Sequence, residues 1–325
     1  MKTACRVLLI ILCAVSAWSQ SESDFESLKV TAQTQDDGRG TRLLEPARLF
    51  FDRNSQELFV ADAGNHRIVI LDTNLLAVHS FDHFVVNSST RETIKGQPMA
   101  VVVSRRGEIF VVDALADYVD VLDFRGQSLE RIYPNRLLGD TTLRIKPTAL
   151  TIDESDNIYL IVSGDKTTLL VLDASLSMIR IIGEVGDKPE NFSTPLAVGV
   201  LEGRVYLTDM HSIPAVKVYD STGAYINGFA AHDIDTKDLS LPQSIGFTVV
   251  AGKPVIWILD TLRQVIKIYS LDGELVYTIG GMGTDLGKFQ FPSGLSTDYK
   301  SIAYVSEKVG GRVQKFQLLD QDVVR

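Results

Sequence analysis

A connection that leads into a short apolar run recurs along this sequence. Eleven positions in or next to this connection are polar or differ from copy to copy. The residue just before that run differs in each copy: Arg67, Tyr118, Thr168, Ala215, Val265 and Arg312. Neighbouring positions add further polar side chains: Asp117, Lys166, His211, Arg263 and Lys308. Arginine and lysine can bind an anionic or sugar-like ligand, and a tyrosine can stack against it. The candidate ligand-binding residues are therefore Arg67, Asp117, Tyr118, Lys166, His211, Arg263 and Arg312. The alternative is that these are solvated turn residues, because turns are polar for many reasons.

These positions recur because the chain is repetitive. A buried-type aromatic returns about every fifty residues: Phe59, Phe110, Tyr159, Tyr206, Trp257 and Tyr304. A proline precedes each copy: Pro46, Pro98, Pro147, Pro195, Pro242 and Pro292. Repeats of this length that hold several short strands are typical of β-propellers. The sequence therefore predicts an all-β, six-bladed β-propeller of four-stranded antiparallel blades.

The two ends of the propeller region predict how the ring closes. The blade cores are expected near 46–80, 98–133, 147–182, 195–229, 242–280 and 292–319. The last copy lacks a clear outer strand, whereas residues 27–33 form a strand-like segment ahead of the first proline. We expect this N-terminal segment to become the outer strand of the last blade, because such pairing removes exposed strand edges.

The first copy, with Val60-Ala61-Asp62 and Asn65-His66-Arg67-Ile68, resembles the NHL-repeat family of six-bladed propellers, and the resemblance extends over roughly residues 28–319. Later copies depart from the motif, since Val162 and Glu307 replace the recurring aspartate. The resemblance implies the fold more strongly than an activity, because this fold includes lyases, hydrolases, sensor domains and binding modules. The four aspartates that remain are expected to accept backbone N–H bonds in their turns rather than to bind metal: Asp62, Asp113, Asp209 and Asp260.

The residue pattern gives little support for a catalytic function. Related six-bladed enzymes use metals near the mouth of the central channel, and this chain has five histidines: His66, His79, His83, His211 and His232. No two of them have a zinc-ligand spacing on one element, and His66 and His211 lie on opposite blades. Neither a Gly-x-Ser-x-Gly nucleophile motif nor a phosphate-binding glycine loop opening a helix is present. We therefore predict no catalytic residue, no metal ligand and no cofactor.

The start of the chain predicts export. Residues 1–20 contain a basic beginning with Lys2 and Arg6, an apolar core, and small residues for cleavage, as in a signal peptide. Both cysteines, Cys5 and Cys13, lie within it, so the expected mature chain, residues 21–325, contains no cysteine. The expected location is secreted or periplasmic, with no membrane insertion. The net charge of −9, which becomes −11 once Lys2 and Arg6 are removed, disfavours nucleic acid as a partner.

The lengths of the connections indicate which face of the ring binds. The connections between second and third strands and between blades are long and irregular, for example 82–97, 183–194 and 230–241. Long loops on a rigid scaffold are where binding groups concentrate. We predict a monomeric binding or scaffold module that recognises a protein, peptide or glycan on this face. The alternative is a metal-dependent lyase or lactonase-type hydrolase with its site at the channel mouth.

Overall fold

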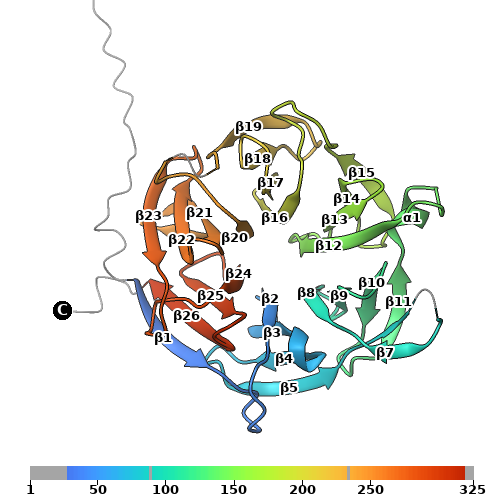
Figure 1. Ribbon diagram of the computed structural model, residues 1–325, viewed down its shortest axis with the longest axis horizontal. Coiled ribbons are helices and arrows are strands. Elements are labelled where there is room, and N and C mark those ends of the chain that lie inside the picture. Colours follow the sequence, from blue (N-terminus) through green and yellow to red (C-terminus); the bar gives the residue numbers. More distant parts are fainter. Residues whose placement is uncertain (1–27, 88–89, 233–234, 319–325) are drawn as a thin grey trace, which may run out of the picture.

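The computed structural model describes residues 28–87, 90–232 and 235–318. In this part of the chain, six four-stranded antiparallel sheets are arranged as the blades of a ring (Figure 1). The predicted six-bladed β-propeller is confirmed. The predicted signal peptide, residues 1–20, lies outside the described residues.

The strands of the first three blades follow the chain from the centre of the ring outward. Blade 1 contains β2 (Pro46–Asp52), β3 (Glu57–Asp62), β4 (Arg67–Leu71) and β5 (Ala77–Asp82). Blade 2 contains β8 (Pro98–Val103), β9 (Ile109–Asp113), β10 (Val119–Leu122) and β11 (Ser128–Ile132). Blade 3 contains β12 (Ile145–Ile152), β13 (Ile158–Gly164), β14 (Thr168–Leu172) and β15 (Met178–Ile182).

The remaining blades keep the same order. Blade 4 contains β16 (Pro195–Leu201), β17 (Arg204–Asp209), β18 (Val216–Tyr219) and β19 (Tyr225–Phe229). Blade 5 contains β20 (Pro242–Val250), β21 (Lys253–Asp260), β22 (Val265–Ser270) and β23 (Leu275–Gly280). Blade 6 contains β24 (Pro292–Thr297), β25 (Ile302–Glu307), β26 (Arg312–Leu318) and, as its outer strand, β1 (Leu28–Thr34).

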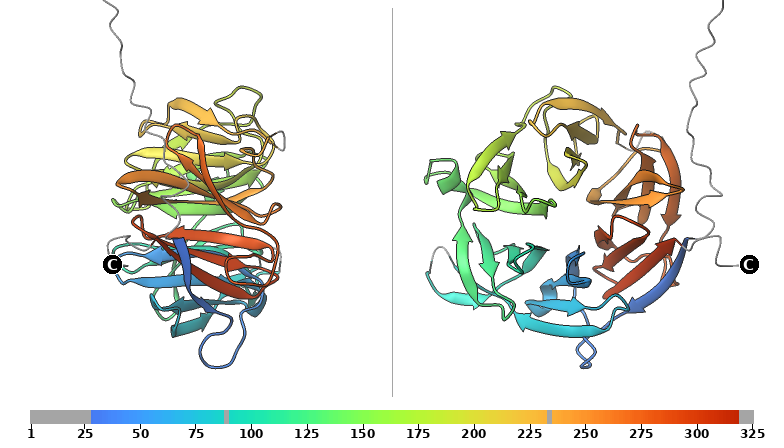
Figure 2. Two further views of the ribbon diagram at one scale, coloured as in Figure 1. Left: turned by 90° about the vertical axis from the view of Figure 1, so that its left-hand side faces the viewer. Right: turned by 180° about the vertical axis from the view of Figure 1, so that it is seen from behind.

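Blade 6 is closed by both ends of the described chain. Strand β1 pairs antiparallel with β26, from Leu28 opposite Leu318 to Thr34 opposite Val313, with a register shift between Val30 and Ala32. Both views of the ring show β1 along the outer edge of β26 (Figures 1 and 2). The predicted closing strand is confirmed. The pairing covers the edge of β26, which would otherwise offer unpaired backbone groups to another chain.

The hydrophobic core is divided among the junctions between neighbouring blades, because each blade is covered on both faces. The recurring aromatic side chains are all buried. Tyr304 of blade 6 stacks on Phe51 of blade 1 with ring centroids 5.2 Å apart, and Tyr206 of blade 4 meets Phe247 of blade 5 at the same distance. These aromatics fill the space between blades, as expected from their regular return.

The recurring aspartates, and Glu307 in blade 6, lie at the entries to their blades, whereas blade 3 has Val162 at this position. Asp209 accepts hydrogen bonds from the backbone of His211 and Ser212 in its own turn, and from Ser193 and Thr194 in the connection from the previous blade. Glu307 has the same role in blade 6, where its carboxylate accepts a hydrogen bond from the backbone N–H of Gln290. The expected structural role is confirmed, and it extends beyond each residue's own turn to the connection that precedes the blade.

Three connections contain regular structure that the sequence pattern did not predict. The loop after blade 1 holds a small hairpin of β6 (Phe84–Val86) and β7 (Thr93–Lys95), and the loop after blade 2 begins with a single helical turn, α1 (Pro134–Leu137). A second short helical turn, η2 (Ala63–Asn65), follows β3. Elements this short have no periodicity to detect. Among the described residues, no helix has the length and apolar character needed to cross a membrane.

Candidate functional site

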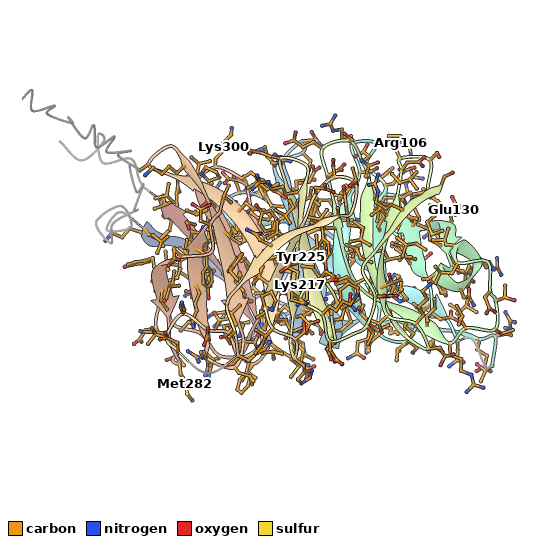
Figure 3. All side chains as sticks on the ribbon, turned by 90° about the horizontal axis from the view of Figure 1, so that it is seen from above. Arg106, Glu130, Lys217, Tyr225, Met282 and Lys300 are labelled. Carbon is orange, nitrogen blue, oxygen red and sulfur yellow. The ribbon has the colours of Figure 1, made fainter. Side chains whose placement is uncertain are left out.

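The two faces of the ring differ in the connections they carry. The innermost strand of each blade begins at the face that holds the connections between blades and between second and third strands; we call it the long-loop face. The opposite, short-turn face holds the turns after the first and third strands. Figure 3 shows Met282 of the long-loop face on one side, with Lys300 and Arg106 of the short-turn face on the other. In the described part of the chain, a cavity opens from the centre of the ring toward each face.

The cavity on the long-loop face is a small, mainly apolar depression of about 190 Å³. Ala47, Met99, Phe291 and Pro292 contribute to its lining, at the entries of three innermost strands. At its rim, Lys308 and Glu45 form an exposed ion pair of 3.4 Å. The depression can receive one apolar side chain of a ligand.

Exposed apolar side chains lie on the same face as this depression. Leu115, Ile213, Leu262 and Val309 occupy the connection between second and third strands in blades 2, 4, 5 and 6, and each is 44–64% exposed. Four more exposed apolar side chains belong to the loops between blades on the same face: Val185, Met282, Leu286 and Phe291. Single exposed apolar residues are ordinary, but a group on one face is typical of an interaction surface.

Two buried lysines fix loops of the long-loop face, and one of these loops carries Ile213 of this surface. The ammonium group of Lys217 donates to Ser212 Oγ at 2.7 Å and to the Pro214 carbonyl at 2.5 Å, on both sides of Ile213. The ammonium group of Lys267 donates to the carbonyls of Thr236, at 2.6 Å, and Asp238. Burial lowers the pKa of Lys217 to about 8. Both lysines satisfy carbonyl groups of irregular loops and so hold these loops in place.

Two of the three arginines among the candidate ligand-binding residues, Arg67 and Arg312, lie inside their own blades. Arg67 is 8% exposed; its guanidinium binds Asp62 at 2.7 Å and Asp37 at 2.6 Å. Burial alone would raise the pKa of Asp37, but hydrogen bonds from the Arg39 amide and the Arg67 guanidinium outweigh burial and lower this pKa. Arg312 similarly binds Glu307 at 2.6 Å. Both side chains support the blade rather than face a ligand.

The other candidates are spread around the long-loop face. Tyr118 is 1% exposed, and its hydroxyl accepts a hydrogen bond from the Val86 amide at 2.9 Å. Lys166 and His211 are exposed, whereas Asp117 and Arg263 are half-buried. Arg263 donates to Ser240 Oγ at 3.0 Å. The structure does not bring the seven candidates into one pocket, and none of them lines either central cavity. Ligand binding by the exposed members remains a prediction.

The histidines considered for a metal-dependent alternative are also dispersed. His66 Nδ1 lies 2.6 Å from the Gly96 carbonyl, and His211 Nδ1 lies 3.1 Å from Thr194 Oγ1. His83 is buried with its Nε2 3.4 Å from Asp113 Oδ2. Neither His66 nor His211 lines the central cavities. Within residues 28–87, 90–232 and 235–318, no three His, Asp or Glu side chains are grouped in a way that could hold a metal ion.

The larger cavity, of about 440 Å³, occupies the channel and opens toward the short-turn face. The innermost strands form its walls, and Arg48 of β2 borders both this cavity and the smaller one. The Arg48 guanidinium reaches across the channel: Nη1 donates to the Thr148 carbonyl at 3.0 Å and Nη2 to the Leu196 carbonyl at 2.7 Å. Burial lowers the pKa of Arg48 to about 10, so the side chain is still charged at neutral pH.

Sequence reasoning missed Arg48, although a signal was available. Arg48 stands two residues after the proline that begins its blade. The equivalent positions of the other blades carry small residues: Ala100, Ala149, Ala197, Ser244 and Gly294. A single large cation at a place reserved for small side chains is a departure from the repeat, and such departures indicate where a symmetric scaffold is specialised.

The comparisons with known proteins identify the fold. No protein-family model matches the chain, and no curated protein matches it. A gluconolactonase from Xanthomonas campestris is 12% identical, with a TM-score of 0.59 over 90% of this chain and 95% of that one. A streptogramin B lyase is 14% identical, with a TM-score of 0.55 over 90% and 97% of the two chains. An auxiliary nutrient binding protein from Bacteroides thetaiotaomicron is 12% identical, with a TM-score of 0.58 over 89% and 75%.

At these identities the likeness shows the six-bladed β-propeller fold and nothing finer. The similar structures include two enzymes and a binding protein, so the fold does not choose between catalysis and binding. The NHL-repeat resemblance stays a prediction. The choice between functions therefore depends on the residues of this chain.

Proposed function

We propose that this protein is an exported binding module that recognises a polypeptide through its long-loop face. The observation that carries the proposal is the set of exposed apolar side chains at equivalent places in four blades: Leu115, Ile213, Leu262 and Val309. A polypeptide can cover such a surface with apolar side chains of its own. A glycan, which presents mainly hydroxyl groups, would leave most of this apolar area without a suitable partner.

The central depression gives the proposed interface an anchor point. Protein interfaces derive much of their affinity from a few large side chains buried in a pocket near the centre, inside a rim that excludes water. Here Met99 and Phe291 help to line such a depression, and the exposed Lys308–Glu45 ion pair lies at its rim. We therefore expect the ligand to insert an aromatic or aliphatic side chain at the centre of the ring.

The rigid loops favour binding without a large rearrangement. Lys217 holds the loop that carries Ile213, and Asp260 accepts backbone hydrogen bonds from Ser240 and Leu241 in the loop before blade 5. Because these contacts fix the loops before a ligand arrives, less conformational entropy is lost on binding. This arrangement suits a scaffold that presents a preformed surface.

The proposal is tested with peptides selected from a random displayed library on the purified full chain. We expect selected peptides to carry an aromatic or aliphatic anchor. The double substitution Leu262→Asp and Val309→Asp should weaken their binding at least tenfold, as measured by fluorescence polarisation. The matched control is Leu76→Asp with Phe124→Asp, because these side chains are each 65% exposed in turns of the short-turn face. Peptide binding that survives the first pair, or is lost equally with the control pair, would contradict the proposal.

A metal analysis of the same preparation addresses the enzymatic alternative. The polypeptide-binding proposal expects peptide affinity to be unchanged by a chelator. Stoichiometric zinc or calcium that disappears in a His66→Ala and His211→Ala variant would instead support a metal-dependent lyase or hydrolase.

A further inference from the structure

The central cavity of the short-turn face has a cation at its inner end and a mostly neutral wall. The apolar part of the wall comes from the innermost strands, including Val102, Ile152, Val198, Ile245 and Leu295. Arg48 lies at the inner end, between this cavity and the depression of the long-loop face. A volume of about 440 Å³ is in the range of small-molecule binding sites.

The hydrogen bonds of Arg48 leave part of its guanidinium unused. An arginine has five N–H groups. Nη1 donates to Thr148, and Nη2 donates to Leu196 and, at a longer 3.4 Å, to the carbonyl of Gln243. Nε is buried and has no hydrogen-bond partner within the described part of the chain. One N–H of Nη1 and the N–H of Nε therefore have no acceptor within the described part of the chain.

The charge of Arg48 is likewise without a counterion. Among residues 28–87, 90–232 and 235–318, no carboxylate forms an ion pair with it; its partners are neutral carbonyls. A buried charge that lacks a counterion is costly, and an anion that enters the cavity would remove part of this cost. The site thus favours a negatively charged ligand over a neutral one of the same shape.

The outer end of the cavity carries charges of both signs. Each of its four carboxylates has a partner: Glu154 binds Arg53 at 3.1 Å, and three others accept backbone N–H groups, Asp156 from Arg105 at 3.0 Å, Asp52 from Asn54 at 2.9 Å and Asp153 from Ser155 at 2.8 Å. The side chains of Arg105 and Lys300 line the same cavity, and no carboxylate of the described chain forms an ion pair with either. Tyr299 crosses this end, with its hydroxyl 3.3 Å from the Val200 carbonyl and Arg53 over its ring.

We propose that the channel binds a small organic monocarboxylate, with its carboxylate facing the guanidinium of Arg48 and its apolar body along the walls of the innermost strands. The single charge at the inner end, which has only neutral carbonyls as partners among the described residues, matches the single charge of one carboxylate. The apolar walls suit an aliphatic or aryl chain better than a free phosphate, which would need more donors than Arg48 has left. This site opens toward the face opposite the polypeptide surface, so the proposal of carboxylate binding can be tested independently of the proposed function.

Isothermal titration of the full chain with acetate, butyrate, hexanoate and benzoate tests the proposal, with hexanamide as the neutral match of hexanoate. We expect affinity to rise with the apolar body and hexanoate to bind at least tenfold more tightly than hexanamide. Arg48→Met should abolish this preference, and Arg48→Lys should keep part of it. The control, Arg125→Met, removes an exposed arginine of a short turn and should leave both affinities unchanged.

A second variant keeps the test decisive if Arg48→Met fails to fold. Thr151 is half-buried on β12 and lines the same cavity, so Thr151→Trp should fill it and prevent hexanoate binding without touching Arg48. Equal binding of hexanoate and hexanamide by the unaltered chain would overturn the proposal. So would the absence of binding throughout the series, or an unchanged affinity for hexanoate in the folded Thr151→Trp variant.

Discussion

At the scale of single residues, His83 and Asp113 form a buried titratable pair between blades 1 and 2. The His83 Nε2 atom lies 3.4 Å from Asp113 Oδ2, and neither atom has a hydrogen-bond partner among the described residues. Burial lowers the pKa of His83 from its usual 6.5 to about 4, and burial raises the pKa of Asp113. Both shifts favour the neutral forms in the folded protein.

The histidine makes stability depend on pH. Between pH 6.5 and about 4 the unfolded chain binds a proton on His83 that the folded chain does not, so the free energy of unfolding falls as the pH falls. The contribution of His83 amounts to about 3 kcal/mol over this window. We expect His83→Phe to lose less stability than the unaltered chain when urea unfolding is compared at pH 7 and pH 4.5.

The raised pKa of Asp113 has the opposite effect on stability from that of His83. As the pH falls, the folded chain binds a proton on Asp113 more readily than the unfolded chain, so this group raises the free energy of unfolding. The comparison therefore has to be made between the unaltered chain and the variant at each pH. His79→Ala, which removes an exposed histidine of β5, serves as the control and should leave the pH dependence unchanged. An identical slope for the His83→Phe variant would show that His83 is not the titrating group.

Residue types alone could not separate buried ion pairs from a binding site. Arg67 and Arg312 stand out in the sequence as variable cations beside loops, which is also how ligand-binding residues appear. Their partners include Asp37, thirty residues before Arg67, and a contact across such a distance leaves no local pattern. Arg48 shows the reverse case, because its importance appears only when three blades place their carbonyls around it.

At the scale of elements, β1 is the strand on which closure of the ring depends. Alternate side chains of β1 are partly buried, and Leu28 and Val30 pack against the core shared by blades 5 and 6. Val30→Asp places a charge at this contact, and we expect it to lower the free energy of unfolding by roughly 2–4 kcal/mol. Urea denaturation followed by far-UV circular dichroism measures the loss.

The neighbouring position provides the control for that experiment. Thr31 is exposed on the same strand, so Thr31→Asp should change stability by about 0.5 kcal/mol or less. Equal losses for the two variants would mean that charge on β1, rather than packing against blade 6, determines the effect.

Elements were more predictable than sites because they repeat. The strands and the closing segment could be predicted because six copies of the repeat share the same pattern of apolar runs, prolines and turns. The hairpin β6–β7 and the turn α1 each occur once, and nothing in the other copies indicates them. The pocket residues are unpredictable for the same reason: Arg48 matters because it differs from its counterparts, and its environment is assembled from β12, β16 and β20.

At the scale of the whole molecule, the described ends of the chain meet within one sheet. Leu28 pairs with Leu318, so the beginning of β1 and the end of β26 lie side by side. We expect a circular permutant that joins these residues by a short Asn-Gly turn, and opens between Ser221 and Thr222, to fold. Circular dichroism and cooperative thermal unfolding would verify this result.

The linear segment 28–318 is the matched control for the permutant, because the two chains share the same native residues. In the permutant, blade 6 becomes one continuous sheet, and blade 4 becomes the blade completed by both ends. If the linear segment folds and the permutant aggregates, the ring can be closed by the two chain ends at blade 6 but not at blade 4.

Arg48 separates the two central cavities while forming part of both. Any solute on one side and any ligand on the other therefore share a single guanidinium as a boundary. Thermodynamic linkage then imposes symmetry: if an anion in the channel alters the affinity of the opposite face by some factor, a partner bound on that face alters the affinity for the anion by the same factor. The two faces of the ring can in this way be coupled energetically through Arg48, without movement of the blades.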